Sequence, residues 1–259
     1  MALAAKEIGT EPEPFRLHGF ALNQLGRYAE AEGQLRWAAA IAPENAQVQS
    51  EYARALMYLG KYEEAHSAYS AAIAANGGNW PLGNRAFNSL MQRKYDDALQ
   101  DIESYLAKDP GNAWALQFRG RVRAFKGDFD AAETDIDAAL AAQPENGDAL
   151  YVKGYILARK MKFAEARPVL EKVLQLDATN SEAMIALGDV AAEEKNDEAA
   201  AQYYEKVAAT PKGTAFADSL HAAAPRSLRQ RRRGSNALPD CSPHAKRKLR
   251  AKPSRLARN

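Results

Sequence analysis

The sequence predicts an all-α protein, an α-solenoid of stacked helical hairpins followed by a disordered basic C-terminal tail. The first observation is an internal echo: LGRYAEA at residues 25–31 returns as LGKYEEA at residues 59–65. The second is an alanine that recurs at steps of 34 residues, with one step of 33, at Ala31, Ala65, Ala98, Ala132, Ala166 and Ala200. The third is composition, because 259 residues with 46% hydrophobic content can bury a sizeable core.

Alignment on these alanines divides residues 12–211 into six units, each with two helices. The units are 12–45, 46–79, 80–112, 113–146, 147–180 and 181–211. The first helix of each unit carries a small residue, in order Gly19, Ala53, Ala86, Gly120, Gly154 and Gly188. Four residues beyond each alanine, the second helix carries a larger one: Leu35, Tyr69, Ile102, Ile136, Leu170 and Tyr204. Positions i and i+4 share a helical face, so we expect the paired helices to interlock there.

The turns and helix starts repeat as well. An aromatic residue follows the turn between the two helices, at Tyr28, Tyr62, Tyr95, Phe129 and Phe163. An asparagine ends each of the first five units, at Asn45, Asn79, Asn112, Asn146 and Asn180. Asparagine side chains accept hydrogen bonds from free amides at a helix start, so these five are predicted N-caps.

Two arginines interrupt the apolar pattern of the first helices. Arg85 and Arg119 are each followed sixteen residues later by an aspartate, Asp101 and Asp135, at the same place in the paired helix. This pattern predicts two ion pairs that bridge the helices of one unit, so both arginines are structural rather than ligand-binding.

These residues resemble the tetratricopeptide repeat, whose 34-residue pattern runs W-x₂-L-G-x₂-Y, then A-x₃-F, then P. The resemblance covers residues 12–211. Its leading tryptophan is replaced here by other apolar residues, at Phe15, Leu82, Leu116, Leu150 and Met184. The resemblance implies a right-handed superhelix whose concave surface, lined by the first helix of each unit, holds a partner's peptide or helix.

Periodicity then indicates which first-helix residues point away from the hairpin interface and toward such a groove. They are Phe20, Arg54, Tyr58, Asn84, Phe87, Met91, Trp114, Gln117, Phe118, Arg121, Phe125, Tyr151, Tyr155 and Arg159. Aromatic and arginine side chains dominate binding hot spots, which favours a peptide with acidic and apolar residues. For Trp114, Phe118, Phe125 and Tyr155, packing against the neighbouring unit is an equal alternative.

The sequence offers no catalytic, cofactor or metal site. Cys241 is the only cysteine, and the four histidines are scattered at His18, His66, His221 and His244. No glycine-rich phosphate loop has the required spacing. We therefore expect a non-enzymatic protein without a cofactor.

The charges are divided between a body and a tail. Residues 1–211 hold 22 Lys and Arg against 31 Asp and Glu, whereas residues 212–259 hold 13 against 2. Residues 1–11 form a lead-in that is compatible with the remnant of an earlier hairpin, residues 212–228 are compatible with a capping helix, and residues 229–259 are expected to be disordered. Three interpretations of the tail stay open: an arm for nucleic acid or an anionic surface, an autoinhibitory segment, or an extension read out of frame.

The prediction for function is a protein–protein interaction scaffold that binds a partner peptide or helix in its groove. The alternative is an adaptor tethered to nucleic acid or an anionic surface through residues 229–233 and 246–250. The sequence shows neither a secretory signal nor a stretch of about 18 apolar residues, so a cytoplasmic location is the default expectation.

Overall fold

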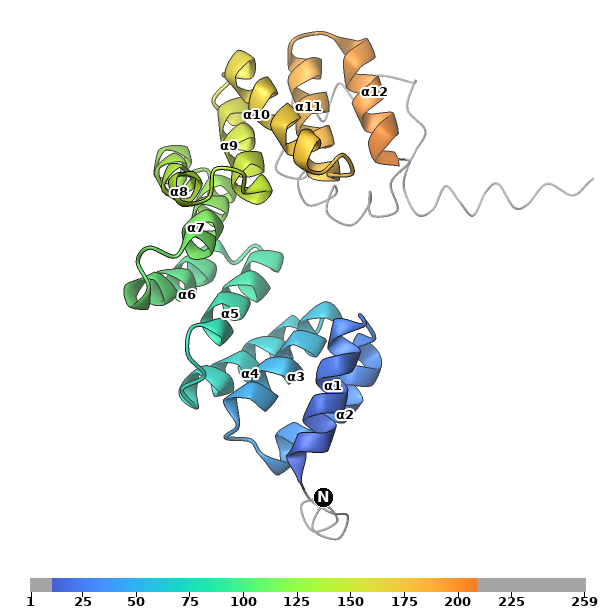
Figure 1. Cartoon of the computed structure of the whole chain (residues 1–259), viewed down its shortest axis with the longest axis vertical. Coiled ribbons are helices and arrows are strands. Elements are labelled where there is room, and N and C mark those ends of the chain that lie inside the picture. Colours follow the sequence, from blue (N-terminus) through green and yellow to red (C-terminus); the bar gives the residue numbers. More distant parts are fainter. Residues whose placement is uncertain (1–10, 209–259) are drawn as a thin grey trace, which may run out of the picture. The chain divides into compact units, whose positions relative to one another are not determined.

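The computed structural model describes residues 11–208, and within them every regular element is an α-helix (Figure 1). The helices are α1 (Pro12–Gln24), α2 (Tyr28–Ile41), α3 (Ala46–Tyr58), α4 (Tyr62–Ala74), α5 (Trp80–Met91), α6 (Tyr95–Lys108), α7 (Ala113–Lys126), α8 (Phe129–Ala142), α9 (Gly147–Arg159), α10 (Phe163–Leu176), α11 (Ser181–Glu193) and α12 (Asp197–Ala208). They form about six consecutive pairs, as the repeat predicts. The predicted lead-in lies outside the described residues except for Glu11, and the predicted capping helix and tail lie outside them entirely.

The chain divides into two compact units, one ending at Val152 and the other beginning at Lys153. In the first unit the two helices of a pair contact each other, as do α2 and α3, α4 and α5, and α6 and α7. The first helices of successive pairs also touch, because α1 contacts α3 and α3 contacts α5. In the second unit α11 contacts both α10 and α12.

The predicted interlock between small and large residues is present. A Cβ atom added to Gly120 would lie 2.8 Å from the side chain of Ile136, and one added to Gly154 would lie 2.5 Å from that of Leu170. Both distances are shorter than carbon atoms tolerate, so only glycine allows the second helix of these pairs to approach so closely. The six stepped alanines are all buried, which gives the repeat its physical cause.

Four of the five predicted N-caps are confirmed. Asn45, Asn112, Asn146 and Asn180 each accept a backbone N–H bond of 2.9–3.1 Å from the first turn of the next helix. Asn79 was wrongly predicted, since its side chain makes no such bond. Pro81 takes a place in the first turn of α5 and has no N–H to donate, and Asn79 itself has helical backbone angles.

Both predicted ion pairs are confirmed. Arg85 binds Asp101 with two hydrogen bonds of 2.8 and 2.6 Å, and Arg119 binds Asp135 with two of 2.9 and 2.6 Å. Both carboxylates are buried. The hydrogen bonds of Asp135 raise the pKa of the Arg119 guanidinium. Each pair therefore ties one helix to its partner.

Candidate functional site

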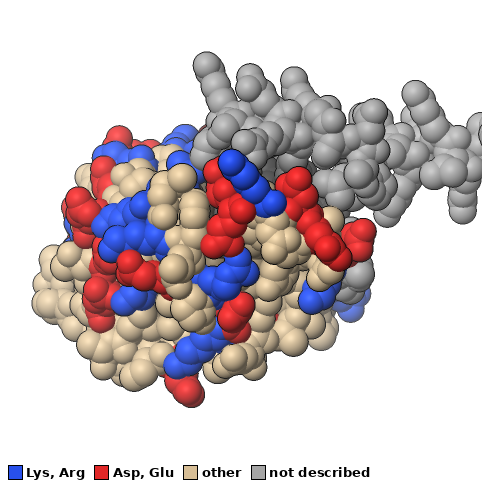
Figure 2. All heavy atoms as spheres, turned by 90° about the horizontal axis from the view of Figure 1, so that it is seen from above, with Lys and Arg blue, Asp and Glu red and all other residues tan. Residues whose placement is uncertain are grey.

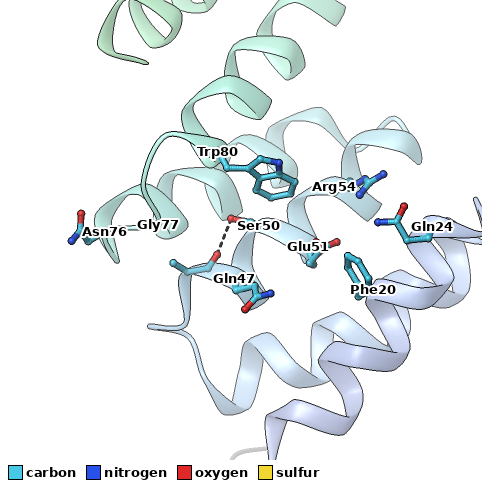
Figure 3. Close-up of a pocket in the computed structure, with 10 residues that line it drawn as sticks. Phe20, Gln24, Gln47, Ser50, Glu51, Arg54, Asn76, Gly77 and Trp80 are labelled. Carbon is cyan, nitrogen blue, oxygen red and sulfur yellow. Dashed lines mark hydrogen bonds between the residues drawn. The ribbon is translucent and has the colours of Figure 1, made fainter. Parts of the chain in front are cut away.

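A pocket of about 590 Å³ opens between the first helices of the first three pairs, and we call it the α3 pocket (Figure 3). Its lining residues are Phe20, Gln24, Ala46, Gln47, Ser50, Glu51, Arg54, Asn76, Gly77 and Trp80. In Figure 3 the side chains of Phe20 and Gln24 extend from α1 toward α3, and the indole of Trp80 extends from α5 toward α3. The pocket thus lies on the first-helix side that the sequence predicts for a groove.

Trp80 forms one aromatic wall of the α3 pocket. The residue is 46% exposed, although it is one of the largest apolar side chains in the unit. Ser50 on α3 lines the same pocket and is buried, and its hydroxyl donates a 2.7 Å hydrogen bond to the carbonyl of Ala46 in its own helix. The Ser50 hydroxyl is thus engaged within its own helix, and Trp80 offers an indole surface to a guest.

Glu51 brings a negative charge to the α3 pocket although the residue is only 5% exposed. Its Oε2 accepts a 3.0 Å hydrogen bond from Nδ2 of Asn23 on α1. That same Nδ2 also donates to the Glu51 backbone carbonyl at 3.0 Å, which joins α1 to α3. Oε1 of Glu51 accepts no hydrogen bond from the described residues, and it is not among the oxygens sealed from solvent without a partner.

Arg54 lines the α3 pocket one turn further along α3. It is half-buried, and within residues 11–208 its guanidinium makes no hydrogen bond and no ion pair closer than 4.0 Å. An arginine presents a rigid fork of donors that fits a carboxylate. Arg54 can therefore bind an acidic group of a partner without breaking a hydrogen bond or ion pair of the described residues.

A second tryptophan, Trp114, lies exposed on α7 and is also 46% exposed. Its ring occupies a notch that Gly83 leaves on α5, since a Cβ atom on Gly83 would lie 2.7 Å from the indole. Trp114 also stacks on Phe118 with centroids 5.5 Å apart, and its centroid lies 5.6 Å from that of Tyr105. The indole is thus held in place while nearly half of its surface stays open.

The two tryptophans occupy the same position in the repeat. Trp80 precedes the stepped alanine Ala98 by eighteen residues, and Trp114 precedes Ala132 by the same eighteen. Sequence reasoning selected Trp114 but missed Trp80, because the 33-residue step makes Trp80 look like the first residue of its unit. Counting backward from the alanine, rather than forward from the unit's start, would have found it.

Three of the predicted groove residues lie inside the fold. Gln117, Phe118 and Tyr151 are all buried, so their side chains are not available to a partner in this structure. Phe118 belongs to a core cluster with residues of α5 and α6, and its ring lies 6.3 Å from that of Phe87. For Phe118 the packing alternative holds, because its side of α7 faces the preceding helix pair.

The other predicted residues differ in how open they are. Phe20, Tyr58 and Met91 are exposed, while Arg54, Asn84, Phe87, Arg121, Phe125, Tyr155 and Arg159 are half-buried. Tyr58 stacks on Tyr28 with centroids 4.3 Å apart, so one face of its ring is covered. Arg121 contacts Asp148 at 3.2 Å and lies over the Tyr151 ring, so its charge already has internal partners. Only Phe20 and Arg54 of the predicted set line the α3 pocket.

Residues 11–208 contain neither a candidate metal site nor a candidate membrane span. No three His, Cys, Asp or Glu side chains of this part gather in a way that could hold a metal ion. Nor does any of its helices combine the length and the apolar character that crossing a membrane requires.

Matches to protein-family models support the prediction of tetratricopeptide repeats. One model described as tetratricopeptide repeat matches residues 119–181 and 161–214, and a second with the same description matches residues 22–85. Together they cover more than half of the chain. No curated protein matches the chain in sequence.

Solved structures share the fold at low sequence identity. A tetratricopeptide repeat protein from Parabacteroides merdae is 20% identical with a TM-score of 0.65, over 77% of this chain and 79% of that one. PilW, described as a type IV pilus biogenesis factor, is 18% identical with a TM-score of 0.67, over 77% and 93%. YrrB, described as a TPR protein with an unusual peptide-binding site, is 17% identical with a TM-score of 0.54, over 71% and 95%.

Proposed function

Because the chain belongs to the tetratricopeptide repeat family, whose members are typically non-catalytic, we propose that it is an interaction scaffold whose first helices bind an extended segment of a partner protein. The segment lies across the compact unit that ends at Val152, and it runs from the α3 pocket toward Trp114. The observation that carries this proposal is that Trp80 and Trp114 occupy equivalent positions in successive repeats and are equally exposed.

Exposed tryptophans at matching repeat positions are suited to an extended ligand. Successive first helices in such a stack lie about 10 Å apart, and an extended peptide spans that distance in about three residues. Two apolar side chains of one segment can therefore contact Trp80 and Trp114 in turn. YrrB, which shares the fold, supports a peptide as ligand through its own description.

Arg54 supports an acidic residue in the same segment. Of the groove arginines predicted from the sequence, Arg121 already pairs with Asp148, and Arg159 has interactions of its own. Arg54 is the one without an ion pair in the described part of the chain. The expected ligand thus combines apolar side chains with a carboxylate, as the sequence pattern favours.

A crosslinking pull-down from the native organism tests this function. The variant Trp80→Ala/Trp114→Ala is expected to lose its specific partners, since tryptophan hot spots contribute about 2 kcal/mol or more each and the loss exceeds tenfold in affinity. Trp37→Ala is the matched control, because Trp37 is 51% exposed but lies on the second helix α2. Equal recovery of every partner by all three proteins contradicts the proposal.

A second function is favoured by the charge of residues 212–259, which hold 13 basic and 2 acidic side chains. We propose that this segment adds an electrostatic contact with nucleic acid or another anionic surface to the scaffold. The segment lies outside the described residues, so the support is the charge count alone.

A further inference from the structure

From the α3 pocket we infer that the bound segment anchors itself through a basic side chain, whose cationic head pairs with Glu51 while its stem lies between Phe20 and Trp80. This inference rests on the proposed function and names the chemistry that one of its sites recognises. The inference adds a basic residue to the apolar and acidic residues that the sequence suggests for the bound segment.

Glu51 departs from the repeat pattern in a way that needs a cause. The equivalent positions in the other units are Leu17, Asn84, Phe118, Val152 and Ala186, none of which is charged. A carboxylate that is withdrawn from water destabilises the folded protein unless it is paired. Here a charged residue occupies a position that holds a neutral residue in each of the other repeats.

The internal partners of Glu51 leave half of its carboxylate unused. Asn23 is neutral and binds only Oε2. Arg16 is near enough to feel the charge of Glu51, but its guanidinium binds both carboxylate oxygens of Glu13, at 2.8 and 2.5 Å. Oε1 therefore remains an acceptor without a donor among the described residues, and because the fold does not seal it, we take it to face the pocket that Glu51 lines.

The rest of the pocket fits a basic side chain. Phe20 and Trp80 supply aromatic surfaces from two sides, and cations are attracted to such faces. The amides of Gln24 and Gln47 add further acceptors at the rim. A guanidinium or ammonium group on a long apolar stem matches this arrangement of apolar walls and a buried negative charge.

Arg54 is the one pocket charge that opposes a cation. It lies three residues beyond Glu51 in α3, is half-buried, and carries a long flexible stem. Glu51 is held in place by Asn23, whereas Arg54 has no ion pair that fixes it within the described residues. Arg54 can therefore turn to the rim and bind an acidic residue of the same segment, next to the base that enters the pocket.

The test uses acetylated and amidated pentapeptides of sequence Ala-Leu-Xaa-Glu-Ala, in which Xaa is arginine, lysine or the uncharged arginine isostere citrulline. The full-length chain, labelled with ¹⁵N, has three indole N–H signals, from Trp37, Trp80 and Trp114. Titration should shift the Trp80 signal with the arginine peptide. The arginine peptide should bind about tenfold more tightly than the citrulline peptide, which is the effect of one charge-assisted hydrogen bond.

Glu51→Gln keeps the shape and the hydrogen bond to Asn23, and it should reduce the arginine-to-citrulline ratio to about one. Glu64→Gln is the matched control, because Glu64 is exposed on the neighbouring helix α4, and it should leave the ratio unchanged. Arg54→Gln removes the opposing charge and should preserve or raise the ratio. Thermal melts of all variants confirm that each is folded.

The outcomes separate this inference from the proposed function. Peptides that bind equally with arginine and citrulline, while Trp80→Ala still abolishes binding, would overturn the cation site and leave the groove in place. A ratio that Glu51→Gln does not change, or no binding of the arginine peptide at millimolar concentration, would also overturn the cation site. Failure of the groove function itself is read from the pull-down.

Discussion

At the scale of single residues, one of the polar groups that the packing of the described residues leaves unsatisfied is the hydroxyl of Tyr69. Tyr69 is fully buried against Ala53 and its neighbours, and within the described residues its hydroxyl has no hydrogen-bond partner. Burial raises the pKa of this phenol well above its ordinary value, with a smaller opposing effect from Arg54. Tyr69 occupies the position of the large residue in the second repeat, residues 46–79. Its ring therefore stabilises the packing of the repeat, whereas its buried hydroxyl destabilises the fold.

Tyr69→Phe is therefore expected to raise the free energy of unfolding at pH 7 by about 1 kcal/mol, the cost of an unsatisfied buried hydroxyl. The gain should grow as the pH rises above about 10, because the unfolded tyrosine ionises there and the folded one does not. Urea unfolding at pH 7 and pH 11 measures both effects. Tyr28→Phe is the control, because Tyr28 is half-buried at the start of α2, and an equal response of the two variants contradicts the account.

At the scale of helices, the caps explain why the first helices begin where they do. Asn112 accepts the amide of Ala115 at 3.0 Å and so satisfies one free N–H of α7. Asn79 stands at the equivalent place before α5 and caps nothing. The same residue type in the same repeat position thus has two different energetic roles.

Asn112→Ala is expected to lower the free energy of unfolding by about 1 kcal/mol, as loss of an N-cap does. Asn79→Ala should change it by less than about 0.5 kcal/mol, because no cap bond is lost. Chemical denaturation of the two variants in parallel tests the difference. Equal losses would mean that the asparagines act through something other than capping.

The helix pairs could be predicted from the sequence because their determinants are local and repeated. The sequence indicates which helix faces meet through three repeated positions: the small residue of the first helix, and the stepped alanine of the second helix with the large residue four positions after it. The structure confirms this interlock at Gly120 and Ile136. The pair of Arg119 and Asp135 could be predicted for the same reason, since both residues recur together one unit earlier.

The site could be predicted only in part. Periodicity gives the direction of a side chain around its own helix, but not where the preceding helix lies, so Phe118 seemed open and is buried. Glu51 was missed because a charge at an otherwise neutral position matters only once its burial is known. Trp80 was missed because the shortened unit shifts its apparent position by one residue.

At the scale of the whole molecule, charged side chains of both signs are mixed in the described part (Figure 2), whereas residues 212–259 are almost entirely basic in their charge. In the described part, acidic and basic side chains lie next to one another on the face that Figure 2 shows, and several of them pair across neighbouring repeats. Lys126 on α7 binds Asp96 on α6, and Arg167 on α10 binds Glu194 beyond α11. Residues 212–259 have almost no acidic side chains to pair with their 13 basic ones. An excess of positive charge of this density attracts polyanions, and binding to DNA then weakens as salt rises.

The full chain is therefore expected to bind a fluorescently labelled DNA duplex with an affinity that falls steeply between low and physiological salt. Each phosphate contact contributes a slope of about −0.9 in log K against log salt, so replacing Arg229, Arg231, Arg232 and Arg233 by glutamine should reduce the slope by about 3 to 4. Fluorescence anisotropy across a salt series measures it. The control replaces Arg27, Arg36, Arg93 and Lys94, exposed cations of the described part, by glutamine. Equal losses of slope in the two quadruple variants would contradict the proposed electrostatic contact between residues 212–259 and nucleic acid.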